Sequence, residues 1–182
     1  MFGFGKKKKS KLPELPVVEN DLGRFTMDYT IENEPTYCYF GDTKILRQNG
    51  GAYVFADVEC DDKGSFSAEK GFARLSEVLA GFPEWERRVK QLALDFAVKE
   101  YVLDDGLIEI WGSWDPKKFD GDYHDDPVTR EDFVKRVCVC GISIYADGET
   151  EFCIDLDDMF TDHGLYIRLD KYENIVYCDL QG

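Results

Sequence analysis

The spacing of apolar residues changes twice along this chain, and each change marks a switch of secondary structure. Apolar and polar residues alternate in residues 25–31, 36–40 and 52–58, as in half-buried β-strands. From residue 67 to residue 103 the apolar residues instead recur every three or four positions, as along one side of an α-helix. Alternation returns after residue 137. A chain that runs from strands to helices and back to strands is typical of an α+β fold.

Two consecutive helices are predicted in the middle of the chain. The first runs from an N-cap at Ser67 to Gly81, and Pro83 begins the second, which ends near residue 103. The second helix carries an apolar stripe at i, i+4, i+7 and i+11, formed by Trp85, Val89, Leu92 and Phe96. This stripe predicts that the helix pair packs on a sheet. A third, short helix is expected after Thr129, whose hydroxyl suits an N-cap.

A hairpin is predicted near the C-terminus. Asp147-Gly148 favours a two-residue type I′ turn, in which Tyr145 pairs with Thr150. This register sorts the side chains between the two faces of the sheet. The face expected to meet the helices holds Val137, Val139, Ser143, Tyr145, Phe152, Ile154 and Leu156, and the other face holds Cys138, Cys140, Ile142, Ile144, Glu151, Cys153, Asp155 and Asp157.

Together these elements predict one domain. The fold class is α+β, with an antiparallel sheet of about six to eight strands and two consecutive helices packed on one face. Residues 1–16 are expected to form a basic flexible arm and Pro linker, and residues 17–182 the single α+β domain. A chain of 182 residues with 43% hydrophobic residues has enough apolar side chains for one packed core.

The N-terminal lysines bear on localisation. Lys6, Lys7, Lys8 and Lys9 precede residues 10–16, which include two prolines and lack the apolar run of a secretory signal. The sequence also lacks a run of about 18 apolar residues, which a membrane span needs. We therefore expect a cytoplasmic protein whose lysines make no stable contact with a membrane and whose six cysteines stay reduced. No cofactor is predicted.

The charge of the chain narrows the class of partner. Asp and Glu number 37 against 22 Lys and Arg, a net charge of −15, so electrostatic repulsion argues against nucleic acid as a ligand. Acidic side chains placed around aromatic residues instead suit a protein partner, in particular a basic one. The candidate binding residues lie in an irregular segment, residues 107–128, and are Trp111, Trp114, Asp120 and Asp122. Core packing is the favoured interpretation of the two tryptophans, and exposure would strengthen the binding hypothesis.

A second acidic cluster offers a different chemistry. Three carboxylates and an imidazole form a ligand set that suits a divalent cation: Asp155, Asp157, Asp162 and His163. Convergence of these groups would support a metal-dependent hydrolase, whereas the same residues also fit charges on a strand face and in a turn. Residues 120–131 fit part of a calcium-loop frame, although Asp125 stands where that loop needs glycine. Zinc held by strand thiolates is the alternative to small buried thiols for Cys138, Cys140, Cys153 and Cys178.

The C-terminal two thirds of the chain resembles the bacterial family catalogued as domain of unknown function 2262. The likeness covers residues 64–182, including the helix pair, and its motifs are residues 129–133 (Thr-Arg-Glu-Asp-Phe), 142–148 (Ile-Ser-Ile-Tyr-Ala-Asp-Gly) and 157–160 (Asp-Asp-Met-Phe). His163 and the closing strand to Gly182 follow them, with Asp162-His163-Gly164 in place of the family's usual Gly-His order. The resemblance implies a bacterial intracellular protein and, since the family has no established activity, supplies no catalytic residues.

The sequence thus favours a binding role over catalysis. We hypothesise a non-catalytic, acidic protein-binding domain of the immunity or inhibitor type, in which negative charge speeds association with a basic partner. The alternative is a metal-dependent hydrolase that uses the acidic cluster from Asp155 to His163.

Overall fold

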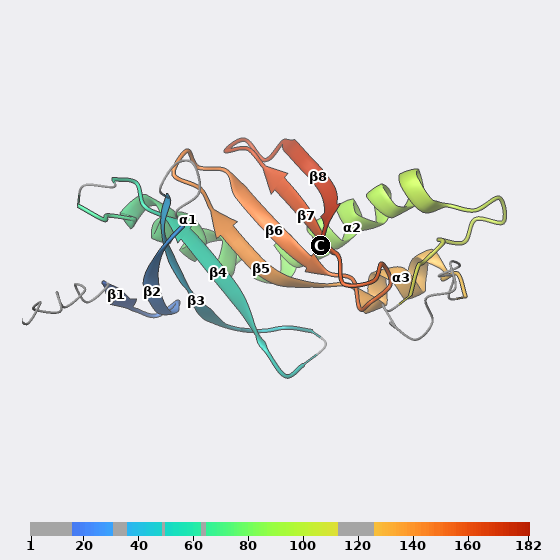
Figure 1. Ribbon diagram of the computed structural model, residues 1–182, viewed down its shortest axis with the longest axis horizontal. Coiled ribbons are helices and arrows are strands. Elements are labelled where there is room, and N and C mark those ends of the chain that lie inside the picture. Colours follow the sequence, from blue (N-terminus) through green and yellow to red (C-terminus); the bar gives the residue numbers. More distant parts are fainter. Residues whose placement is uncertain (1–15, 31–35, 49, 63–64, 113–125) are drawn as a thin grey trace, which may run out of the picture.

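The computed structural model describes residues 16–30, 36–48, 50–62, 65–112 and 126–182. In these ranges the chain forms one eight-stranded sheet and three helices, and the strands lie in the sheet in sequence order (Figure 1). In chain order the elements are β1 (Val17–Glu19), β2 (Gly23–Thr30), β3 (Thr36–Leu46), β4 (Tyr53–Glu59), α1 (Glu69–Ala80), α2 (Phe82–Tyr101), α3 (Arg130–Arg136), β5 (Cys138–Ile144), β6 (Thr150–Asp155), β7 (Gly164–Leu169) and β8 (Ile175–Gln181).

The sheet is antiparallel except at its centre, where β4 and β5 run parallel. The connection between these two strands contains all three described helices, because parallel neighbours need a long crossover and cannot be joined by a tight turn. Helices α1 and α2 pack on one face of the sheet (Figure 1). The predicted α+β fold with two consecutive helices on one face is therefore confirmed.

Helices α1 and α2 make close contacts with the sheet. On α1, Gly71 lies so near β4 that an added Cβ would stand 2.5 Å from Val58 Cγ1. On α2, the Trp85 ring stacks on Phe152 of β6 with 5.4 Å between the ring centroids. Val89 of the same helix is fully buried. The predicted stripe of α2 thus packs in one core with the strand residues Val139, Phe152 and Ile154.

Helix α1 begins one residue later than the predicted N-cap would place it, because Ala68 and not Ser67 occupies the N-cap position. Ser67 does not cap the helix and instead pairs with Asp62 in an isolated β-bridge. The Asp61 carboxylate takes over the capping role from outside the helix, since it accepts a hydrogen bond from the Lys70 amide at 2.9 Å. The N-terminus of α1 is therefore satisfied by a residue distant in sequence, which a local capping pattern does not reveal.

Helix α2 carries Pro83 in its first turn, as predicted, but ends at Tyr101 instead of near residue 103. The chain turns back at that point, and the Glu109 amide donates to the Tyr101 carbonyl at 2.9 Å. Neither α2 nor another helix in the described ranges is long and apolar enough to cross a membrane. Thr129 caps α3 as predicted, accepting a hydrogen bond from the Asp132 amide at 3.1 Å.

The β5–β6 hairpin has a three-residue loop, and the predicted register is wrong by one residue. Gly148 donates its amide to the Tyr145 carbonyl at 3.0 Å and has a left-handed backbone conformation with φ of 93°. The Tyr145 amide donates in turn to the Glu149 carbonyl at 3.0 Å. A tight turn followed by a left-handed glycine is the common form of a three-residue hairpin loop. Thr150 therefore pairs with Ile144 and not with Tyr145.

The corrected register exchanges side chains between the two faces of β5. Ile142 and Ile144 are buried on the helix side. Ser143 and Tyr145, which the sequence predicts there, lie on the opposite face. A bulge after Val139 shifts the register again and keeps Val139 on the helix side, as predicted. β5 thus buries Ile142 and Ile144 and leaves Ser143 on the other face.

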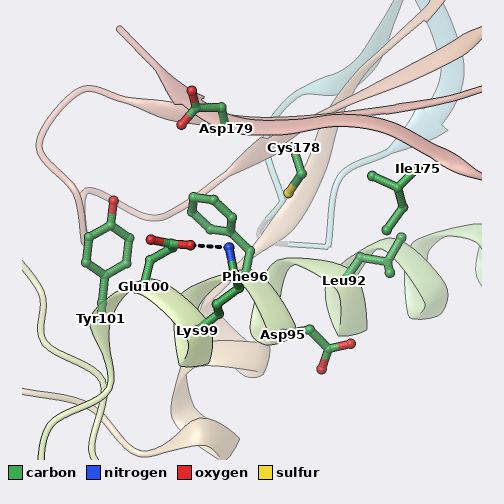
Figure 2. Close-up of a pocket in the computed structure, with 9 residues that line it drawn as sticks. All are labelled: Leu92, Asp95, Phe96, Lys99, Glu100, Tyr101, Ile175, Cys178 and Asp179. Carbon is green, nitrogen blue, oxygen red and sulfur yellow. Dashed lines mark hydrogen bonds and ion pairs between the residues drawn. The ribbon is translucent and has the colours of Figure 1, made fainter.

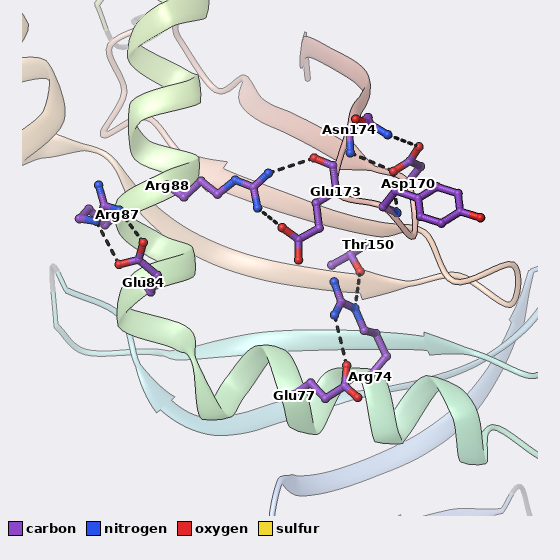
Figure 3. A network of polar contacts seen from close by, with 10 residues as sticks. Arg74, Glu77, Glu84, Arg87, Arg88, Thr150, Asp170, Glu173 and Asn174 are labelled. Carbon is purple, nitrogen blue, oxygen red and sulfur yellow. Dashed lines mark hydrogen bonds and ion pairs between the residues drawn. The ribbon is translucent and has the colours of Figure 1, made fainter.

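Two arginines connect the helices to the ends of the strands through polar contacts (Figure 3). Arg88 of α2 pairs with the Glu173 carboxylate in the β7–β8 turn and also donates to the Glu173 carbonyl at 3.0 Å. Arg74 of α1 reaches the Thr150 hydroxyl of β6 at 3.4 Å. Both guanidinium groups lie over the Trp85 ring, at 5.1 Å for Arg88 and 5.6 Å for Arg74. The helix layer is therefore fixed to one face of the sheet by polar as well as apolar contacts.

Candidate functional site

Trp111 is a predicted binding residue that packs against the core. Its ring meets those of Tyr101 and Phe160 edge to face, with centroid distances of 5.6 Å and 5.5 Å. Its segment forms isolated β-bridges at Ile108 and Gly112. The other three predicted binding residues lie outside the described residues: Trp114, Asp120 and Asp122. Trp111 is partly buried and packs against the hydrophobic core.

The three carboxylates predicted as metal ligands are held apart by different partners. Asp157 accepts a hydrogen bond from Arg136 Nε at 2.7 Å. Asp155 lies on β6 with an oxygen 3.9 Å from Arg47 Nη1. The Asp162 side chain is 84% exposed in the turn before β7. Asp155 and Asp162 line the same pocket, whereas Asp157 is paired with Arg136 outside it.

The fourth predicted ligand, His163, is engaged locally. Its Nδ1 atom lies 2.7 Å from Thr161 Oγ1 and 3.1 Å from the Phe160 carbonyl oxygen. Its nearest predicted co-ligand is Asp162, at 3.7 Å. Across the described ranges, no group of three or more His, Cys, Asp or Glu side chains is arranged to hold a metal ion. Of the four predicted ligands, Asp155, Asp162 and His163 line one pocket of about 240 Å³, and Asp157 is not among its lining residues.

The face of the sheet opposite α1 and α2 is not covered by a described helix (Figure 1). Side chains that pair across neighbouring strands point to the same face, so the strand register identifies the residues on it. Its carboxylates are Glu19, Asp28, Asp42, Asp57, Glu59, Glu151 and Asp155. Between them lie the aromatic residues Phe40, Phe55, Tyr145, Tyr166 and Tyr177. We call this surface the acidic face.

Asp57 lies in the middle of the acidic face, on β4 between β3 and β5. It lines a pocket of about 140 Å³ together with Cys38, Glu59, Ser143 and Tyr145. Its Oδ1 atom is buried and, within the described part of the chain, has no hydrogen-bond partner. A buried carboxylate oxygen without a hydrogen-bond partner is costly to the free protein.

The surroundings of Asp57 oppose its ionisation. Burial raises the pKa of this carboxyl above its ordinary value of 3.8, and the negative charges of Glu59, Asp28 and Glu151 raise it further. A hydrogen bond from the Cys38 thiol acts in the opposite direction and lowers the pKa of Asp57. A cation seated in the pocket would counter the repulsion between these carboxylates.

Arg24 of β2, which lies between Glu19 and Asp42, and Arg168 of β7 neutralise only part of the acidic face. The Arg168 guanidinium donates to Glu151 at 2.9 Å and to the Tyr145 hydroxyl at 2.7 Å, and it lies 4.1 Å from the centroid of the Tyr145 ring. The Tyr145 hydroxyl donates to Glu151 at 3.1 Å and closes the network. Asp57 and Glu59 have no ion pair among the described residues. Positive charge is therefore missing at the centre of the face.

A larger hollow lies between α2 and the edge strand β8 (Figure 2). Its volume is about 530 Å³, and its walls combine apolar and charged side chains: Leu92, Asp95, Phe96, Lys99, Glu100, Tyr101, Ile175, Cys178 and Asp179. Lys99 and Glu100 pair with each other (Figure 2). This groove contains both positive and negative side chains. We therefore expect it to attract a basic partner less strongly than the acidic face does.

Asp57 and Glu59 are not among the site residues predicted from sequence, although the sequence contains a signal for them. In β4 the residues that alternate with the buried Val54, Ala56 and Val58 are aromatic or acidic: Tyr53, Phe55, Asp57 and Glu59. The alternation predicts that these four side chains share one face. It does not reveal that the helices cover the other face, because that depends on packing between distant segments.

A comparison with known protein families identifies the family of this chain. Residues 19–180 match a family described as an uncharacterized protein conserved in bacteria (DUF2262), and the match runs from β1 to β8. No curated protein and no solved structure matches the chain. Since the family match covers most of the chain, the protein belongs to the DUF2262 family, as the sequence motifs predicted.

Proposed function

We propose that this protein is a non-catalytic protein-binding domain whose acidic face binds a basic surface on a partner protein. The observation that carries the proposal is the uncovered sheet face, on which Asp57 and Glu59 lack an ion pair within the described ranges. A lysine or arginine side chain of the partner would enter the pocket that Asp57 and Glu59 line and place its positive charge beside these carboxylates. An inhibitor or immunity protein works by such a preformed, charge-complementary surface.

The aromatic residues of the acidic face complement its charge. Phe40 is 53% exposed, and its ring lies 5.9 Å from that of Phe55 on the next strand. Tyr145 is held in place by Arg168. Rigid aromatic side chains provide contact area at a low cost in conformational entropy. The surface therefore offers both electrostatic steering and apolar contact to a protein partner.

Binding of a labelled octa-lysine peptide, measured by fluorescence anisotropy at about 0.1 M salt, tests this function. We expect the double variant Asp57→Asn/Glu59→Gln to bind the peptide about tenfold more weakly than the native protein, equivalent to about 1.4 kcal/mol. The matched control is Asp95→Asn/Asp104→Asn, which makes the same change in net charge beside the helix layer. Equal weakening in both variants would mean that net charge alone attracts the peptide, and would overturn the proposal.

The immunity form of this function makes a separate genetic prediction. If the protein neutralises a toxin, we expect genes that encode family members to lie next to genes for basic toxins. Co-expression of such a toxin with the native protein and with the Asp57→Asn/Glu59→Gln variant then provides the measurement. If both proteins rescue growth equally, immunity does not depend on the carboxylates of the acidic face.

A further inference from the structure

Two cysteines on the neighbouring strands β5 and β6 bring their sulfur atoms together on the acidic face. The Sγ atoms of Cys140 on β5 and Cys153 on β6 are 3.1 Å apart. The bulge in β5 causes this approach, because Gly141 takes the position directly opposite Cys153 and Cys140 falls beside it. Both cysteines are free thiols. A disulfide needs about 2.05 Å between the sulfurs, so a movement of about 1 Å would join them.

The two thiols line a pocket that opens to solvent. It has a volume of about 240 Å³, and Asp155, His163 and Tyr166 are also among its lining residues. Cys153 is half-buried, whereas Cys140 is 8% exposed. Cys153 is therefore the more accessible of the two cysteines to a small reagent that enters the pocket.

Hydrogen bonds distinguish the two sulfurs chemically. The Cys140 thiol and the Tyr166 hydroxyl both donate to Cys153, and these bonds lower the pKa of the Cys153 thiol despite its burial. The same contact, with Cys153 as the acceptor, raises the pKa of Tyr166 to about 12. It also raises the pKa of Cys140, which keeps its proton. Cys153 is thus the nucleophile of the pair and Cys140 the donor beside it.

We infer that Cys140 and Cys153 form a redox-active dithiol that hydrogen peroxide oxidises to an intramolecular disulfide. The Cys153 thiolate attacks one peroxide oxygen, the O–O bond breaks, and the hydroxide that leaves takes a proton to become water. The Cys140 sulfur then attacks the sulfenic acid on Cys153, the S–O bond breaks, and a second water leaves. The two thiols lose two electrons in all and the peroxide gains them. A dithiol such as dithiothreitol reverses the change.

The other cysteines provide an internal comparison. Cys178 lines the groove between α2 and β8, where it is the one cysteine among the lining residues (Figure 2). Burial raises the pKa of its thiol to about 11. Cys178 therefore has access to solvent without a thiol neighbour in the groove, and a Cys178→Ser variant is a matched control for the pair.

Peptide mass spectrometry of the full-length protein tests this inference. The protein is treated with hydrogen peroxide, free thiols are blocked with iodoacetamide, and disulfides are then mapped before and after dithiothreitol. We expect a Cys140–Cys153 disulfide in the native protein and in Cys178→Ser, formed at least about tenfold faster than oxidation of Cys178. Oxidation of Cys178 first, or of Cys153 to sulfonic acid without a disulfide, would overturn the inference.

Two variants test the order of the steps. In Cys140→Ser, we expect Cys153 to stop at the sulfenic acid, which dimedone traps as a stable adduct. In Cys153→Ser, we expect Cys140 to keep its free thiol at the same peroxide dose. A dimedone adduct on Cys140 in this variant would contradict the assignment of Cys153 as the nucleophile. Disulfide mapping on the native protein needs neither variant, so the inference stays testable if one of them fails to fold.

Discussion

At the scale of single residues, Asp57 connects the stability of the free protein with its proposed binding. Burial and neighbouring carboxylates raise the pKa of Asp57, so the folded state binds its proton more tightly than the unfolded state does. Stability is therefore lost as pH rises from the ordinary value of 3.8 through the raised folded value, and the ionised group is a cost at neutral pH. A residue that is costly in the free protein is typical of a functional site.

We expect Asp57→Asn to raise the melting temperature at pH 7, because asparagine keeps the shape of the side chain without the repelled charge. In a chain of this size each kcal/mol gained corresponds to about 2–4 °C. Scanning calorimetry from pH 3 to pH 7 provides the check, and the difference from the native protein should vanish towards pH 3. A lower melting temperature at pH 7 would show that Asp57 stabilises the free protein.

Arg168 provides the second prediction at this scale. Its removal would leave Glu151, which is 8% exposed, as a nearly buried and unpaired charge. We expect Arg168→Met to lower the free energy of unfolding by about 2 kcal/mol, a value reduced for the partial exposure of the arginine. Urea denaturation of Arg168→Met, Glu151→Gln and the double variant measures the coupling. If the effects of the two substitutions on the free energy of unfolding are additive, Arg168 and Glu151 do not stabilise each other.

At the scale of elements, the local sequence of the β5–β6 hairpin does not suffice to predict its loop length and strand register. Asp147-Gly148 is compatible with a two-residue type I′ turn and equally with the last two residues of a three-residue loop. The choice depends on which strand residues become buried. The three-residue loop sends Ile142 and Ile144 to the core, whereas the predicted turn would have placed Ser143 and Tyr145 there. Apolar burial therefore overrides the turn preference.

We expect Gly148→Ala to destabilise the protein by about 1 kcal/mol, because φ of 93° is strained for a residue with a Cβ. The matched control is Gly81→Ala, since Gly81 has an ordinary φ of −102° and an added Cβ would make only normal contacts there. Thermal denaturation of the two variants distinguishes them. If Gly148→Ala loses no more stability than Gly81→Ala, the left-handed loop does not require glycine.

At the scale of the whole molecule, the sequence predicts the fold class but not the acidic face. The fold class and the helix pair follow from periodicity, since the stripe that includes Trp85 and Val89 permits only a helix packed on an apolar surface. The acidic face does not follow in the same way. Asp57 and Asp155 are separated by almost 100 residues, and only the pairing of β4 with β5 and of β5 with β6 brings their strands together. Sequence spacing alone cannot provide such pairings.

The acidic face is the central claim, and one NMR titration tests it most directly. Octa-lysine is added to the ¹⁵N-labelled full-length protein at about 0.1 M salt, and changes in amide chemical shift are mapped by residue. We expect the largest changes at Asp57, Glu59 and Tyr145, with little change along α2. Changes concentrated instead at Leu92 and Phe96 in the α2–β8 groove would contradict the claim, as would a spectrum that the peptide leaves unaltered.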